Sequence, residues 1–239
     1  GYNSLYINTS GTNNTAVGSS TLAANRTGSD NTALGANALA LNTASNNSAV
    51  GANALAANTT GTNNMAVGNN TLAANKTGSN NTAIGVNALT LNTTSNNSAV
   101  GYNSLSSNTS GSRNTAMGYN SLAANITTTD NTAIGFNALS VSTASYTTAI
   151  GSSALAANTT ANFNTAIGYR SLTSNTTGGS NTAIGASSLT TNTTGISNTA
   201  IGYSTLTLNT TGRSNVAIGS SSLSKNETGT DNVAIGHSA

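Results

Sequence analysis

The stretch NTAIGASSLTTNTTGISNTAIG, residues 181–202, carries the motif NTAIG at both of its ends, so that the motif's glycine is Gly185 in one copy and Gly202 in the next. Related motifs recur along the whole chain of 239 residues. Aligned on the motif's glycine, the sequence divides into units that begin at Gly1, Gly18, Gly35, Gly51, Gly68, Gly85, Gly101, Gly118, Gly135, Gly151, Gly168, Gly185, Gly202 and Gly219, and Gly236 opens one more. Such self-similarity at a fixed period is typical of a solenoid.

The unit length follows a pattern of its own. Most units are as long as the one from Gly185 to Gly202, and those beginning at Gly35, Gly85 and Gly135 are one residue shorter. The first nine units therefore form three equal blocks that begin at Gly1, Gly51 and Gly101, which indicates duplication of a three-unit segment. We interpret residues 1–239 as a single repetitive domain of about fourteen 16- or 17-residue coils. Because the sequence starts and stops within a repeat, we expect it to be a segment of a longer fibre.

The composition excludes several classes of protein. Only 4% of the residues are charged and 4% are aromatic, the net charge is +2, and proline and cysteine are absent. The few basic residues are scattered, so the chain lacks the basic patch of a nucleic-acid-binding protein. It also lacks an apolar stretch of about 18 residues that could span a membrane. We expect no contact of this segment with nucleic acid or membrane, and no disulfide or thiolate metal site.

Two large apolar residues recur in each unit, and the sequence predicts that both are buried. A leucine stands four positions after each unit glycine, and a large aliphatic residue precedes the next glycine. Asn, Gly and Thr disfavour helix, while Thr-Ala-Ile alternates as a short strand does. We predict an all-β fold, a parallel β-roll (β-solenoid) whose coils stack about 4.8 Å apart. The predicted core comprises Leu5, Leu22, Leu39, Leu55, Leu72, Leu89, Leu105, Leu122, Leu139, Leu155, Leu172, Leu189, Leu206 and Leu223 with Ile84, Ile134, Ile150, Ile167, Ile184, Ile201 and Ile218.

Small and amide side chains recur at fixed positions as well. Asn stands seven positions after the glycine in every unit except at Ser142, and another Asn precedes the Thr-Ala pair except at Thr147. Stacked coils would align these amides in hydrogen-bonded ladders. The third position after the glycine is always Ala, Ser or Thr, and the residue before the large aliphatic is always Ala. We predict that these small side chains form flat outer columns that allow another chain to approach closely; a monomeric roll with this face in solvent is the alternative.

Stretches such as NTAIGASSL, NTAIGFNAL and NSAVGANAL resemble the SVAIGxxA repeat of trimeric autotransporter adhesin heads of the YadA type. They are equally similar to repeats in trimeric tail-fibre proteins of phages and bacteria. The resemblance implies a left-handed β-roll, three parallel chains about a common axis, and an extracellular location on a bacterial cell surface or a virion fibre. The head repeat of that family is shorter, so the turn containing TTG is longer here.

Side chains that differ from coil to coil are the candidates for recognition. Aromatic residues follow the unit glycine at Tyr102, Tyr119, Phe136, Tyr169 and Tyr203, and basic residues lie in or near the turns at Arg26, Lys76, Arg113 and Arg213. The aromatic residues are interpreted either as a ligand-contacting patch or as padding along a strand edge. If the fibre binds along its length, these positions would contact a surface polysaccharide or a host receptor. Binding at a tip outside this segment is the other possibility.

The sequence favours a structural or adhesive surface fibre over two other classes. An ice-binding solenoid is the alternative, because threonine columns on an uncharged face could order water, although the turn column is broken at Arg26, Lys76, Ile126 and Glu227. An enzyme would need clustered acids, bases or metal ligands. His237 is the single histidine and the four acids form no repeated pair, so we expect no enzymatic activity, no catalytic or metal-binding residues and no cofactor.

Overall fold

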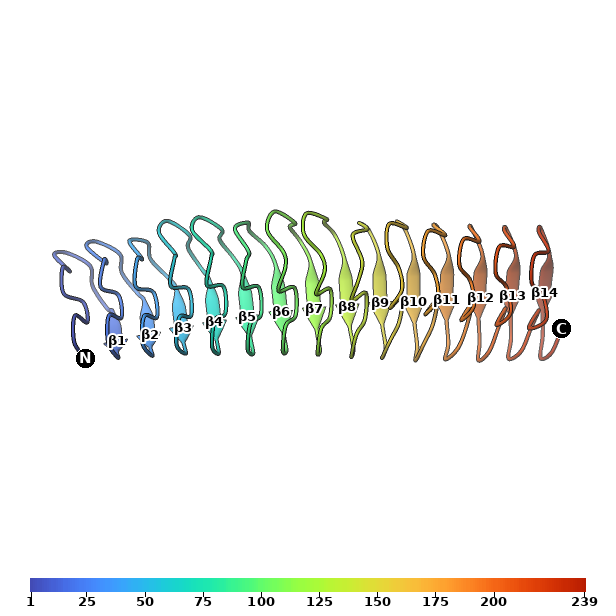
Figure 1. The fold of residues 1–239 in the computed structure, drawn as a ribbon, viewed down its shortest axis with the longest axis horizontal. Coiled ribbons are helices and arrows are strands. Elements are labelled where there is room, and N and C mark those ends of the chain that lie inside the picture. The colour runs from blue at the N-terminus through green and yellow to red at the C-terminus, as the bar shows by residue number, and fades with distance from the viewer. The chain divides into compact units, whose positions relative to one another are not determined.

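A computed structural model describes all residues, 1–239, and contains strands and turns but no helix. The fourteen strands are short and parallel, and they wind as a β-solenoid (Figure 1). They are β1 (Thr15–Val17), β2 (Thr32–Leu34), β3 (Ser48–Val50), β4 (Met65–Val67), β5 (Thr82–Ile84), β6 (Ser98–Val100), β7 (Thr115–Met117), β8 (Thr132–Ile134), β9 (Thr148–Ile150), β10 (Thr165–Ile167), β11 (Thr182–Ile184), β12 (Thr199–Ile201), β13 (Val216–Ile218) and β14 (Val233–Ile235). The predicted all-β solenoid is confirmed.

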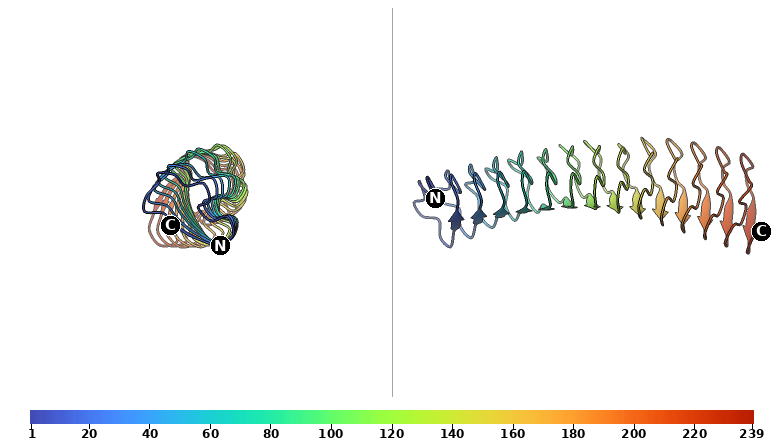
Figure 2. Two further views of the ribbon diagram at one scale, coloured as in Figure 1. Left: turned by 90° about the vertical axis from the view of Figure 1, so that its left-hand side faces the viewer. Right: turned by 60° about the horizontal axis from the view of Figure 1, so that its bottom comes forward.

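The chain forms two compact units, Gly1–Asn114 with β1 to β6 and Thr115–Ala239 with β7 to β14. Within each unit the strands are neighbours in sequence order, and successive turns overlie one another when viewed end-on (Figure 2). Equivalent residues pair throughout: Ala33 lies beside Ala49 across a short coil, and Ala49 lies beside Ala66 across a full one. The missing residue of a short coil is therefore absorbed in the turn, and the strand register is unchanged.

Each strand ends at a glycine whose backbone no other residue adopts easily. The unit glycines from Gly18 to Gly236 have φ between 124° and 136°. A Cβ atom at Gly151 would lie 2.4 Å from the carbonyl oxygen of Gly168 in the next coil. The recurring glycine is thus required both by its dihedral angle and by the close approach of neighbouring coils.

The leucine column is buried, as predicted. Leu22 and the equivalent leucines up to Leu206 have no exposed surface, while Leu5 and Leu223, in the first and last coils, are partly exposed. All of these leucines have φ between 46° and 52°, a left-handed conformation that costs about 1–2 kcal/mol per residue. Burying a leucine side chain contributes about 1.5–3 kcal/mol. Burial therefore offsets the backbone strain. A fully exposed leucine would lack this compensation for its left-handed conformation.

Buried asparagines form the predicted ladders. Nδ2 of Asn175 donates to Oδ1 of Asn158 at 3.0 Å and to the carbonyl oxygen of Gly178 at 2.9 Å. Nδ2 of Asn192 in turn donates to Oδ1 of Asn175 at 2.8 Å. These amides therefore satisfy one another and the turn backbone inside the solenoid.

We expect Asn175→Leu to lower the free energy of unfolding by about 3 kcal/mol, because it removes three buried hydrogen bonds and leaves Oδ1 of Asn158 without a partner. Thermal melting of this variant measures the effect. Thr177→Ala is the control, because Thr177 lies two residues away in the same turn and is exposed. Equal melting temperatures for the two variants would show that the ladder does not stabilise the fold.

Candidate functional site

The outer face of the strands carries a column of large aliphatic side chains, and this corrects the sequence prediction. In β10 and β11 the central alanines, Ala166 and Ala183, have no exposed surface, whereas Ile167 and Ile184 are each 36% exposed. The same alternation holds along the chain, so none of the isoleucines predicted in the core (Ile84, Ile134, Ile150, Ile167, Ile184, Ile201 and Ile218) is fully buried. The interior is filled by Leu, Ala and Asn, and the aliphatic column lies outside.

The columns of small residues lie inside, which is a second correction. Except at the two ends of the chain, the strand alanines and the side chains three positions after the unit glycine, such as Ser171 and Ser188, are buried. The hydroxyl of Ser171 donates to the carbonyl oxygen of Gly168 at 3.0 Å, and that of Ser188 to Gly185 at 3.1 Å. These residues face the interior of their own coil. They cannot form the outer surface on which the sequence predicts that a partner chain packs.

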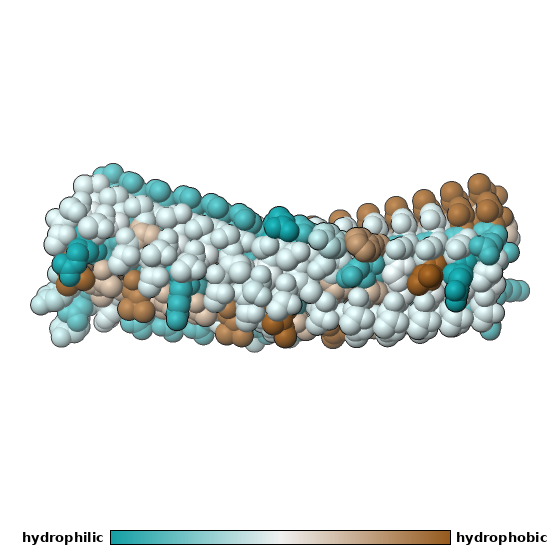
Figure 3. Space-filling model, turned by 90° about the horizontal axis from the view of Figure 1, so that it is seen from above, coloured by the Kyte–Doolittle hydropathy of each residue, from teal (hydrophilic) through white to brown (hydrophobic).

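Apolar side chains are also visible on the surface (Figure 3). Most of the view is pale, and a row of strongly apolar atoms runs along its upper edge toward the C-terminal end. In the second unit the outward aliphatic residues are Met117, Ile134, Ile150, Ile167, Ile184, Ile201, Ile218 and Ile235. Because β7 to β14 are neighbours in register, these side chains form one continuous stripe.

Aromatic side chains form two stacked pairs in the second unit. The rings of Tyr119 and Phe136 have centroids 5.4 Å apart, and those of Tyr146 and Phe163 are 5.3 Å apart. Tyr102, Tyr169 and Tyr203 are also exposed, as a recognition role requires. Tyr146 is not among the predicted sites. Its signal in the sequence is that Tyr146 and Phe163 occupy equivalent turn positions in adjacent coils.

The second aromatic pair stands in an unfavourable backbone conformation. Tyr146 has φ of 57° and Phe163 has φ of 60°. In other coils this position holds Asn, Asp, Ser or Arg, of which Asn and Asp tolerate the left-handed region best. Two bulky aromatic residues in this position are therefore outliers, and outliers of this kind gather at functional sites.

The four basic residues predicted as recognition positions do not form a cluster. Arg26, Lys76, Arg113 and Arg213 are all exposed, and each lies on a different coil. No group of three or more His, Cys, Asp or Glu side chains is placed to hold a metal ion. No helix is present that is long and apolar enough to cross a membrane.

No model of a protein family matches the chain, and no curated protein matches it significantly. The likeness to adhesin heads and tail fibres therefore rests on the repeat motifs alone.

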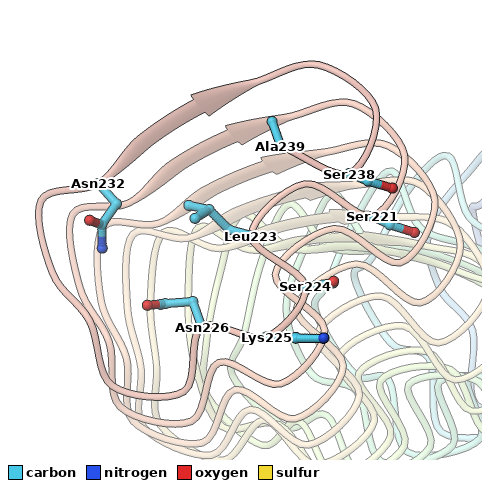
Figure 4. A pocket seen from close by; sticks show the side chains of 8 residues that line it. All are labelled: Ser221, Leu223, Ser224, Lys225, Asn226, Asn232, Ser238 and Ala239. Carbon is cyan, nitrogen blue, oxygen red and sulfur yellow. The ribbon is translucent and has the colours of Figure 1, made fainter.

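A hollow with a volume of about 620 Å³ lies over the last turn (Figure 4). It is lined by Ser221, Leu223, Ser224, Lys225, Asn226, Asn232, Ser238 and Ala239. Leu223 and Asn226 occupy positions that are fully buried in the preceding coil, at Leu206 and Asn209. The hollow is thus the uncovered interior of a coil and differs from a cleft in the side of the solenoid.

Proposed function

We propose that this chain is a structural and adhesive surface fibre, in which three parallel copies of a left-handed β-roll associate through the outward aliphatic column. The observation that carries the proposal is the continuous stripe of partly exposed Met and Ile side chains along β7 to β14 of the second unit. Contiguous exposed apolar surface of this kind marks interaction sites in soluble proteins. In the proposed homotrimer the chains pack through the strand face. This differs from the sequence prediction, in which they pack through columns of small residues.

The proposed setting is extracellular, on a bacterial cell surface or a virion. A solenoid of neutral, hydrogen-bonded coils suits the role of spacer, because each coil repeats the same contacts with its neighbours. The proposal includes no enzymatic activity, cofactor, nucleic-acid partner or membrane contact for this segment. The motif resemblance to trimeric adhesin heads and tail fibres supports the same reading.

Lysines in the aliphatic column should dissociate the trimer. We expect the double variant Ile167→Lys, Ile184→Lys to have the mass of a single 23.3 kDa chain in light scattering, because burying unpaired ammonium groups in an apolar contact is strongly unfavourable. The control Thr177→Lys, Thr194→Lys places the same two charges on exposed turns of the coils that begin at Gly168 and Gly185. A double isoleucine variant that associates as the control does would exclude this face as the interface.

The adhesive part of the proposal assigns lateral recognition to the exposed aromatic pairs, with surface polysaccharide as the ligand. Aromatic side chains supply large contact area, and three copies at each level would add avidity toward a repetitive target. On a glycan array, we expect the trimer to bind surface polysaccharides. We expect the double variant Tyr146→Asn, Phe163→Asn to lose this binding. Asn suits the backbone there, so folding is preserved. The control is Ile196→Asn, another exposed apolar turn residue.

A glycan array without signal for the unsubstituted chain would contradict lateral recognition and leave the segment as a spacer. Equal binding by the aromatic variant and the Ile196→Asn control would place recognition elsewhere on the surface. Neither result would affect the trimer, which the lysine variants test separately.

Ice binding is the second candidate function, and one observation favours it. The strand face bears an unbroken outward threonine column at Thr115, Thr132, Thr148, Thr165, Thr182 and Thr199. The turn threonines that suggest ice binding from sequence are engaged instead: the hydroxyl of Thr176 donates to the carbonyl oxygen of Thr193 at 3.1 Å. Both candidates need the same strand face. A monomer that produces thermal hysteresis would favour ice binding, whereas a trimer without hysteresis would favour the fibre.

A further inference from the structure

The contacts between neighbouring coils are not uniform within the first unit. Between the coils that begin at Gly51 and Gly68, the backbone N–H and the hydroxyl of Thr59 both donate to the carbonyl oxygen of Lys76 at 2.9 Å. Nδ2 of Asn75 also donates to Oδ1 of Asn58 at 3.0 Å. These three hydrogen bonds connect the turns of the two coils.

All three are missing between the next two coils, which begin at Gly68 and Gly85. Lys76 has no side-chain hydroxyl, and its backbone N–H donates no hydrogen bond to the following coil. Nδ2 of Asn92 donates to the carbonyl oxygen of Thr94 at 2.7 Å and does not reach Asn75. Oδ1 of Asn75 is therefore buried without a hydrogen-bond partner.

The same defect recurs in the preceding three-coil block, between the coils that begin at Gly18 and Gly35. Arg26 takes the place of Lys76, and Nδ2 of Asn42 turns to the carbonyl oxygen of Ala44 at 2.7 Å. Oδ1 of Asn25 is again buried without a partner. In both cases the second coil is a short one, so its shortened turn places the ladder asparagine out of reach.

The third short coil, in the second unit, follows a different arrangement. Ser142 replaces the ladder asparagine, and Thr128 stands where Gly28 and Gly78 stand in the earlier blocks. The hydroxyl of Thr128 donates to Oδ1 of Asn125. Oδ1 of Asn125 therefore has a hydrogen-bond donor, whereas the equivalent atoms of Asn25 and Asn75 have none. A buried acceptor without a donor lowers the stability of the fold.

We infer that the boundaries in front of the short coils at Gly35 and Gly85 are built-in opening planes, at which the first unit separates before any other coil contact breaks. In a stack where each coil contacts only its neighbours, the weakest interface sets where opening begins. The two planes occupy the same place in successive three-coil blocks. Opening at both planes therefore separates groups of three coils from one another. This inference is independent of the proposed function.

Hydrogen exchange of single leucine amides, followed by NMR on the full chain, tests the inference. The amide of Leu72 donates to Ala88 across the plane at Gly85, while those of Leu55 and Leu89 donate to Thr71 and Ser104 across full boundaries on either side. After correction for intrinsic rates, we expect Leu72 to exchange about a hundredfold faster than Leu55 and Leu89, as the loss of three hydrogen bonds implies. Equal rates would overturn the inference.

A matched pair of variants tests the cause. Lys76→Thr restores a turn hydroxyl that can donate to the next coil, and we expect it to slow exchange of Leu72 about fivefold. Lys76→Ala removes the same charge without adding a donor and should leave that rate unchanged. If the two variants slow exchange equally, the missing hydrogen bonds are not the cause, and the opening plane is refuted.

Discussion

Gly168→Ala is expected to lower the free energy of unfolding by about 4 kcal/mol, by combining backbone strain with a steric clash. Gly168 follows β10 and has φ of 133°, a conformation that L residues with a side chain rarely adopt. A Cβ atom there would lie 2.6 Å from the carbonyl carbon and oxygen of Gly185. Because the obstacle is backbone in the next coil, relief requires the coils to move apart.

Gly179→Ala is the matched control for this prediction. A Cβ atom at Gly179 meets nothing closer than the carbonyl oxygen of Asn162 at 3.2 Å, and Gly179 has no positive φ. We expect its effect on stability to be within about 0.5 kcal/mol. Denaturant unfolding measures both variants, and similar midpoints would mean that coil spacing does not depend on the unit glycine.

Leu122→Asn is expected to destabilise the chain by about 3 kcal/mol, because the substitution opens a void and places an amide among apolar side chains. Leu122 has no exposed surface. One effect opposes this loss: Leu122 has φ of 50°, and asparagine tolerates that conformation about 1 kcal/mol better than leucine does. The lost burial outweighs the relieved backbone strain, so the net change remains destabilising.

The same substitution at Leu208 provides the comparison. Leu208 is 44% exposed in an outer position of another coil, so Leu208→Asn removes little buried surface. Thermal melting should therefore separate the two variants clearly. If Leu122→Asn melts at the same temperature as Leu208→Asn, the leucine column is not the apolar core of the solenoid.

The repeat, the strands and the leucine column could be predicted because their signals are periodic and local. Alternation in Thr-Ala-Ile shows only that alanine points opposite to its two neighbours. The alternation does not show which face of the strand points to the interior. If the wrong face is chosen, every side chain of the strand is assigned to the wrong side. Size alone favours the larger residue inside, whereas Ala183 is buried and Ile184 is exposed. The coil interior already contains leucine and asparagine and accepts only a methyl group from the strand.

Other features depend on contacts between coils, which a single repeat does not reveal. The recurrence of asparagine predicts the ladder, but the bare oxygens of Asn25 and Asn75 arise only when a short coil follows a full one. The pairing of Tyr146 with Phe163 likewise requires that a short coil and a full coil stack in register. Neither property can therefore be predicted from a single repeat.

Sedimentation equilibrium of the unsubstituted chain tests the central proposal most directly. The outward column of Ile167, Ile184 and their equivalents would be covered in a trimer and left in water in a monomer. We predict a single species with three times the 23.3 kDa mass of the chain, unchanged over a wide range of protein concentration. A stable species with the mass of one chain would contradict the account of the strand face as the interface of a trimeric fibre.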